Sequence, residues 1–173
     1  MSNRFKDTLK KIRDDSTKRN VAGLAVRSEA DLERSDKTVQ AFEFRESVEK
    51  VIEEFVENFQ AEAPSFVLTR GFFEGKYMLA LRADEQLNNA DGELAGYFSR
   101  VMFLLDPHTA DDEFSIQCRR TVRNHDTETT TTSAQMTDDA QVALGAFIEK
   151  QFIDFAERYF AETELTAPAS ANS

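Results

Sequence analysis

The chain has 173 residues, of which 40% are hydrophobic and 31% are charged, and its formal net charge is −11. The apolar share is enough for one hydrophobic core and excludes a wholly disordered chain, and the length fits one domain with polar ends better than two domains. Such an acidic body repels a phosphate backbone, which disfavours nucleic acid as a partner.

The cysteine content and the hydropathy pattern bear on the cellular compartment. Cys118 is the only cysteine, which excludes an intramolecular disulfide and a Cys-rich zinc site. No apolar run approaches the roughly 18 residues that a membrane span needs. The first residues lead into charged sequence rather than into the apolar run of a secretory signal. We therefore expect a cytoplasmic protein that does not span a membrane.

The N-terminal part of the chain is basic and weakly amphipathic. Residues 1–27 carry eight Lys or Arg and three Asp or Glu, a net charge of +5, which leaves −16 for the remainder. Three apolar residues recur there at helical spacing: Phe5, Leu9 and Ile12. They predict a short basic helix over residues 4–19, with a stripe too thin to be stable alone. The mixed sequence of residues 16–37 predicts a linker, so that residues 1–37 form an arm outside the domain.

A strong amphipathic helix is predicted over residues 38–61. Its apolar residues recur every three or four positions: Phe44, Val48, Val51, Ile52, Phe55 and Phe59. Glutamates occupy most of the opposite side, which is most simply a solvated face. Pro64 ends the helix, because proline disfavours helical geometry in the residue before it.

Residues 65–84 change to a period of two and predict a β-hairpin with a tight turn at Glu74 and Gly75. A two-residue turn there places apolar residues opposite each other: Phe72 with Tyr77, and Leu68 with Leu81. Because the apolar sets of both strands then share a face, this register is favoured over its neighbours.

Three further strands follow a polar stretch at residues 85–96, which predicts a loop or a single helical turn. Residues 97–105 are apolar on both sides, as in a central strand covered on both faces. Residues 113–123 alternate, and Cys118 then points into the core as an inert thiol. Residues 127–134 are rich in threonine without a large apolar residue, which is typical of an exposed edge strand.

A second strong helix is predicted over residues 138–161. It has a broad apolar face: Leu144, Phe147, Ile148, Phe152, Phe155 and Tyr159. Such a face exceeds what one sheet face usually buries, which indicates a partner, most simply a second copy. Residues 164–173 predict a disordered tail.

The predicted elements together give an α+β fold. An antiparallel meander of about five strands packs with two long amphipathic helices, one before and one after the sheet. The short basic helix precedes them. Residues 38–163 form a single domain in this prediction.

Two arginines interrupt predicted strand faces that are otherwise apolar. Arg70 and Arg120 each lie between two apolar residues of the same face. Because an unpaired buried guanidinium is costly, we expect both to pair with carboxylates of the long helices, such as Glu62 or Glu157. The alternative is that Arg70 and Arg120 hold an anionic ligand in a pocket between helices and sheet.

The sequence predicts no catalytic residue, no metal site and no cofactor. His108 lies among acidic residues from Asp106 to Glu113, but the spacing of an EF-hand is absent, and a solvated turn is the simpler interpretation. The phosphate-loop, zinc-protease, serine-hydrolase and dinucleotide motifs do not occur.

These features favour a binding or assembly role over an enzyme. In general outline, an acidic α+β domain with helices on either side of a meander resembles type III secretion chaperones and similar dimeric binding domains. The resemblance implies self-association and a protein partner. We therefore expect a non-enzymatic, chaperone- or adaptor-like protein. The alternatives are a small anionic-ligand binder or minor enzyme that uses Arg70 or Arg120, and a component whose basic arm docks on an acidic partner.

Deletion of Met1 to Arg19 is expected to leave the fold intact, because its apolar stripe is too thin to belong to the core. Thermal unfolding followed by circular dichroism should be equally cooperative in the full-length and truncated chains, with midpoints within about 3 °C of each other. A truncated chain without a cooperative transition would show that the arm is part of the core.

Overall fold

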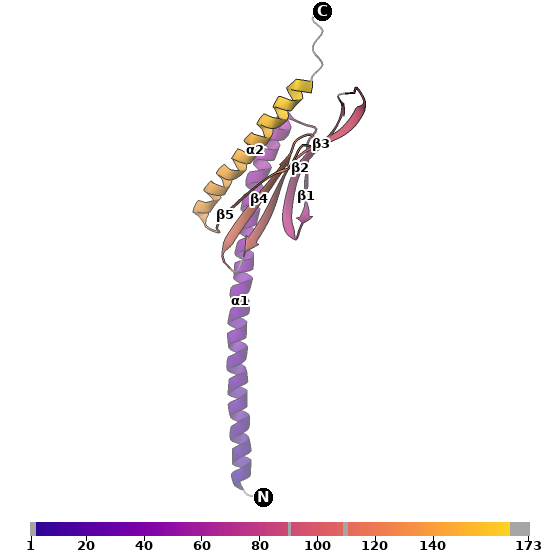
Figure 1. Ribbon diagram of the computed structural model, residues 1–173. Coiled ribbons are helices and arrows are strands. Elements are labelled where there is room, and N and C mark those ends of the chain that lie inside the picture. The colour runs from indigo at the N-terminus through magenta and orange to yellow at the C-terminus, as the bar shows by residue number, and fades with distance from the viewer. Residues whose placement is uncertain (1–2, 90, 109–110, 167–173) are drawn as a thin grey trace, which may run out of the picture. The chain divides into compact units, whose positions relative to one another are not determined.

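The computed structural model describes the backbone of residues 3–89, 91–108 and 111–166, and the side chains of residues 29, 31–89, 91–108 and 111–162. Its elements are α1 (Asn3–Glu62), β1 (Val67–Phe73), β2 (Lys76–Asn88), β3 (Leu94–His108), β4 (Glu113–Thr121), β5 (Glu128–Gln135) and α2 (Asp138–Thr166) (Figure 1). The strands form one antiparallel sheet in the order β1-β2-β3-β4-β5. This confirms the predicted α+β fold, a five-strand meander with one helix before it and one after it.

Helix α1 is longer than the sequence predicted. Its backbone is helical without a break from Asn3 to Glu62, so the predicted linker over residues 16–37 is wrong. The short helix predicted over residues 4–19 is the first part of this long one. No proline precedes Pro64, and the single Gly23 costs a helix only about 1 kcal/mol. Low amphipathicity was therefore mistaken for irregular structure.

The chain divides into two compact units, Met1–Gln40 and Ala41–Ser173. In the first unit, the side chains that the structure describes, residues 29 and 31–40, are all exposed. The second unit holds the sheet, α2 and the C-terminal part of α1. Of the predicted disordered tail, residues 164–166 are helical as the end of α2, and residues 167–173 lie outside the described residues.

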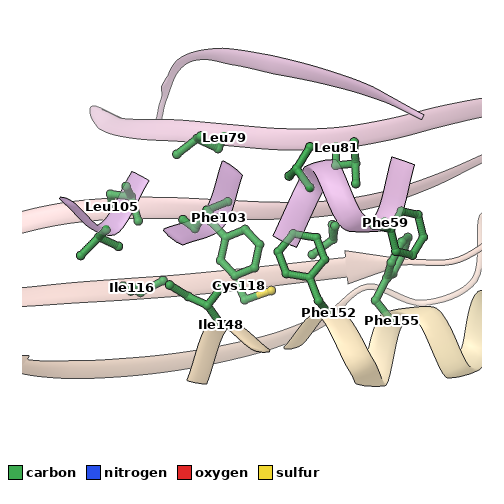
Figure 2. Close-up of a cluster of buried hydrophobic side chains, with 14 of the residues drawn as sticks. Phe59, Leu79, Leu81, Phe103, Leu105, Ile116, Cys118, Ile148, Phe152 and Phe155 are labelled. Carbon is green, nitrogen blue, oxygen red and sulfur yellow. The ribbon is translucent and has the colours of Figure 1, made fainter. Parts of the chain in front are cut away.

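The core of the second unit lies between one face of the sheet and both helices (Figure 2). Alternate residues of the middle strands contribute to it: Leu79, Leu81, Val101, Phe103, Leu105, Phe114, Ile116 and Cys118. Phe59 of α1 and Ile148, Phe152 and Phe155 of α2 meet them from the helical layer. Because one buried cluster contains residues of both helices, the two helices share the same sheet face. Cys118 is buried there, as predicted.

The apolar face of α2 is buried within the chain, which corrects the interpretation that it needs a partner. Phe152 stacks on Phe55 of α1 and on Phe103 of β3, with ring centroids 5.7 and 5.4 Å apart. Tyr159 packs edge-to-face on Phe66 at 5.0 Å. The width of this face is explained because α2 packs on α1 as well as on the sheet, and Phe59 of α1 also contacts it.

The first hairpin has the predicted register. Phe72 pairs with Tyr77 across β1 and β2 around the turn at Glu74 and Gly75, which both have positive φ. The loop predicted at residues 85–96 is wrong in extent, because β2 and β3 continue pairing as far as Asn88 and Leu94. These strand ends contain few large apolar residues, so they lack the regular apolar alternation that identifies a strand.

Strand β3 is the central strand, as predicted, and Val101 to Leu105 are at most 1% exposed. The two faces are covered differently, however. Helical residues of the second unit cover one face, whereas none of those described in that unit packs on the other (Figure 1). Strand β5 is the predicted threonine-rich edge. None of the helices in the described part of the chain has a stretch long and apolar enough to cross a membrane.

Two isoleucines of α2 offer a matched test of this core. Ile148 is fully buried between the layers, whereas Ile153, on the same helix, is half exposed. Ile148→Ala is expected to lower the free energy of unfolding by about 2–5 kcal/mol, because it leaves a cavity. Ile153→Ala should cost about 1 kcal/mol or less. Urea unfolding measures both, and equal losses would contradict this placement of α2.

Candidate binding face

The two arginines singled out by the sequence are both held in ion pairs. Arg70 on β1 places its Nε 3.3 Å from Glu49 and 3.1 Å from Glu53, both on α1. Arg120 on β4 lies 2.9 Å from Asp154 of α2 and 3.0 Å from Glu128 of β5. The expected pairing with carboxylates of the protein is confirmed.

The partners differ from those suggested by the sequence. They are neither Glu62 nor Glu157, because sequence spacing does not fix which helix turn lies over which strand. Arg70 and Arg120 also do not meet. Their strands are three strand spacings apart, which separates the two backbones by roughly 14 Å. Each guanidinium is held by carboxylates of its own, and the binding of an anionic ligand by Arg70 or Arg120 stays a prediction.

A buried ionic cluster that the sequence did not predict joins the end of α2 to the sheet. Arg123 is 7% exposed; its Nε lies 3.3 Å from Glu85, and its Nη1 donates to the carbonyl of Glu162 at 2.6 Å. The hydroxyl of Tyr159 donates to Glu85 at 2.7 Å. Burial, reinforced by this hydrogen bond, raises the pKa of Tyr159 to about 12. Such closed pairing of donors and acceptors fastens elements together and leaves no group free for chemistry.

The sheet face opposite the helices combines apolar and arginine side chains. We call it the open face and define it by Phe73, Met78, Ala80, Arg82, Phe98, Arg100, Met102, Leu104 and Arg119. Ala80, Met102 and Leu104 are buried there, and their cluster contains no helical residue of the second unit. Met78 packs against them, and the apolar stem of a neighbouring arginine suits such surface, because its charged end still reaches water.

Three guanidiniums gather on this face. Arg82 and Arg100 lie opposite each other on β2 and β3, and Arg119 lies opposite Met102 on β4. The guanidinium carbons of Arg82 and Arg100 lie 4.7 and 5.8 Å from the centroid of the Phe98 ring. This range is that of cation–π attraction.

The three arginines differ in how their charge is compensated. Arg82 lies 2.6 Å from Asp84, and Arg119 lies 2.7 Å from Glu74. Arg100 has no carboxylate within ion-pair distance among the described residues, and its buried Nε has no hydrogen-bond partner there. Burial, and next the charges of Arg82 and Arg119, lower the pKa of Arg100. Its charge is therefore the costly one on this face.

Sequence reasoning missed Arg100 although a signal was available. Arg100 lies between Phe98 and Met102 on alternate positions of one strand, the same pattern that singled out Arg70 and Arg120. The expectation that β3 was covered on both faces hid it. The three arginines differ in their ion-pair partners. Arg70 and Arg120 pair with glutamates and an aspartate of the chain, whereas Arg100 pairs with no described carboxylate.

A hollow of about 420 Å³ adjoins the open face where β2 and β3 extend together. Arg82, Phe98 and Asn124 line it with two carboxylates, Asp84 and Glu85. Asn124 fixes this end of the sheet, because its side chain accepts from the backbone of Phe98 at 2.8 Å. A small anion entering the hollow meets the two carboxylates as well as one guanidinium that is already paired.

The described residues offer little for covalent or metal chemistry. Burial raises the pKa of Cys118 to about 12, so its thiol is not ionised at neutral pH. Among the residues that the structure describes, no three His, Cys, Asp or Glu side chains are grouped to hold a metal ion. In the acidic turn, Asp106 pairs with Lys76 at 3.2 Å.

Comparison with protein-family models, with curated proteins and with solved structures finds no match to this chain.

Replacement of Arg120 by methionine tests whether its ion pairs are structural. Arg120→Met is expected to cost about 1 kcal/mol at pH 7, because Asp154 and Glu128 keep Lys150 and Arg158 as partners. Urea unfolding of both chains at a series of pH values measures the cost.

The cost should also depend on pH. Hydrogen bonds from Lys150 and Arg120 lower the pKa of Asp154 in the folded chain. Stability from such a carboxylate is complete above its unfolded pKa of about 3.9 and is lost as the pH falls through the lower folded value. The difference between wild type and Arg120→Met should therefore shrink below about pH 4. A constant difference down to pH 3 would contradict the pairing.

Proposed function

We propose that the protein is a non-enzymatic binding and assembly protein, chaperone- or adaptor-like, that engages an acidic segment of a protein partner on its open face. The observation that carries this proposal is the charge of Arg100, which lies between two other arginines without a carboxylate of its own among the described residues. A carboxylate from a partner offsets that cost, since a guanidinium forms its strongest hydrogen bonds with ionised acceptors.

The apolar part of the open face supports a peptide segment over a lone anion. Phe73 is partly exposed and stacks under Arg119, with the guanidinium carbon 5.4 Å from the ring centroid. Met78, which packs against Ala80, Met102 and Leu104, adds further apolar surface to this face. A segment that alternates acidic and aliphatic side chains satisfies both the guanidiniums and this surface, whereas a free anion uses only the charge.

The net charge of −11 restricts which partners fit. A strongly acidic protein is repelled at long range, but at physiological salt the Debye length is about 8 Å, so local contacts dominate close to the surface. The fitting partner therefore carries a short acidic segment rather than a high total charge. The same acidity disfavours a nucleic acid.

A small anionic ligand is the second candidate function, and the hollow beside Arg82 supports it. The sequence suggested a pocket between helices and sheet for such a ligand. The site considered for it here is the hollow of about 420 Å³. Asp84 and Glu85 in its lining weigh against an anion, which is why the peptide segment ranks first.

Self-association in the cytoplasm is also part of the proposal. The open face is poorly suited to it, because a two-fold pairing of two open faces brings the arginines of both copies together. Like charges at such an interface cost several kcal/mol. We therefore expect self-association through a surface other than the open face, which leaves the arginines of the open face available to a different partner.

Fluorescence anisotropy with a labelled peptide of alternating Glu and Leu tests the open face. Wild type is expected to bind it, and Arg100→Met should weaken binding tenfold or more, up to about 100-fold, because a charged hydrogen bond of roughly 1.5–3 kcal/mol is lost. Arg158→Met, on α2 and paired with Glu128, is the matched control for net charge and should leave binding unchanged.

Three results would contradict the proposal or shift it. Equal weakening by Arg100→Met and Arg158→Met would reduce the effect to overall charge. Equal binding of a peptide with Gln in place of Glu would remove the role of the guanidinium. Displacement of the peptide by millimolar citrate or inorganic phosphate, with an effect of Arg82→Met, would favour the small-anion function.

A further inference from the structure

The two edges of the sheet differ in character. Strand β5, at one edge, is half threonine and has no large apolar residue. Strand β1, at the other edge, pairs only with β2 among the described strands. It exposes three large apolar side chains: Val67 (63%), Phe72 (74%) and Phe73 (39%). An exposed apolar edge strand is a template for pairing with another chain, and β1 contains no lysine, no proline and no bulge that blocks it.

We propose that β1 pairs antiparallel with β1 of a second copy, around a two-fold axis at Arg70, to form a continuous ten-strand sheet. The inference rests on the proposed self-association and names its surface. The axis is perpendicular to the sheet, so the helices of both copies lie on the same side of it. Both open faces then lie on the other side.

The sequence of β1 is self-complementary in this register. Pairing Arg70 with Arg70 of the partner subunit places Val67 opposite the partner's Phe73 on the open face. It also places Leu68 opposite the partner's Phe72 on the helix-facing side. Both pairs are apolar and each residue of β1 has a counterpart. A slip of two residues, the smallest that keeps the faces matched, leaves either Val67 and Leu68 or both phenylalanines unpaired.

The charges at the axis permit this pairing. Like charges directly opposite each other destabilise two paired strands. Each Arg70 is, however, held by Glu49 and Glu53 of its own chain, whose two carboxylates outweigh its charge. The axis therefore carries two compensated guanidiniums rather than two bare cations.

The seven residues of β1 bury less surface than a typical stable interface of about 1,200–2,000 Å². The dimer is therefore expected to form in the micromolar range and to depend on concentration. Sedimentation velocity over a micromolar concentration series should show wild type shifting from the mass of one chain to twice that mass.

Two substitutions at side chains of similar solvent exposure test whether β1 is the dimer interface. Phe72→Lys places a charge in the edge and is expected to hold the chain at the monomer mass at every concentration. Val142→Lys, at 77% exposure on α2, replaces an equally exposed apolar residue elsewhere and should dimerise as wild type does. Circular dichroism confirms that both variants are folded, which their exposure permits.

Disulfide formation tests the register. Under mild oxidation, a mixture of Val67→Cys and Phe73→Cys chains should give a cross-linked dimer, because opposite residues approach within the 4.4–6.8 Å between Cα atoms that a disulfide spans. Either variant alone should not, since two copies of one position lie about 20 Å apart along the strands. Cys118 is buried and does not compete.

The outcomes separate the two proposals. Wild type that stays at the mass of one chain throughout the series overturns both self-association and the β1 pairing. A wild-type dimer that persists in Phe72→Lys, with no cross-link in the cysteine mixture, leaves self-association standing and overturns the β1 pairing. Loss of the dimer in Phe72→Lys together with the mixed cross-link supports both.

Discussion

The covering of only one sheet face by both helices is the constraint on which the rest of the structure depends. The core on that face holds the C-terminal part of α1, all of α2's apolar face and the alternate residues of the middle strands. On the other face Met102 and Leu104 are equally buried, and Met78 is the described side chain that packs against them. Arginine suits this surface because its long stem is apolar, but its guanidinium also places a positive charge on the face.

The arginines of the sheet and its turns differ in whether ion pairs within the chain compensate their charge. Arg70, Arg120 and Arg123 each join a strand to a helix through carboxylates or a helix carbonyl, so they hold the two layers in place. Arg82 and Arg119 are compensated within the sheet and its turns. Arg100 faces the side without a helix and therefore lacks the supply of glutamates that the long helices provide. The candidate function follows from this asymmetry between the faces.

The two proposed surfaces are compatible because, of the residues that define the open face, only Phe73 also lies in β1. Pairing through β1 leaves the open face uncovered and places two such faces side by side in one sheet. A partner with two acidic segments then binds more tightly than either segment alone, through effective concentration rather than through new contacts. Two-fold pairing through the open faces themselves brings like charges together, which favours the edge as the place of self-association.

The sequence by itself determined the elements and their local pairing: the two amphipathic helices, the hairpin register of Phe72 with Tyr77, the buried Cys118 and the need of Arg70 and Arg120 for carboxylates. These follow from periodicity, turn residues and the cost of buried charge, which act between neighbours in the chain. It did not determine the continuous α1 or the ends of β2 and β3, where too few large apolar residues occur to give a periodic signal. Only the tertiary structure decided that α2 packs on α1, that Glu49 and Asp154 are the partners, and that Arg100 has none among the described residues. Periodicity shows which residues share a face, but packing between distant elements decides what covers that face.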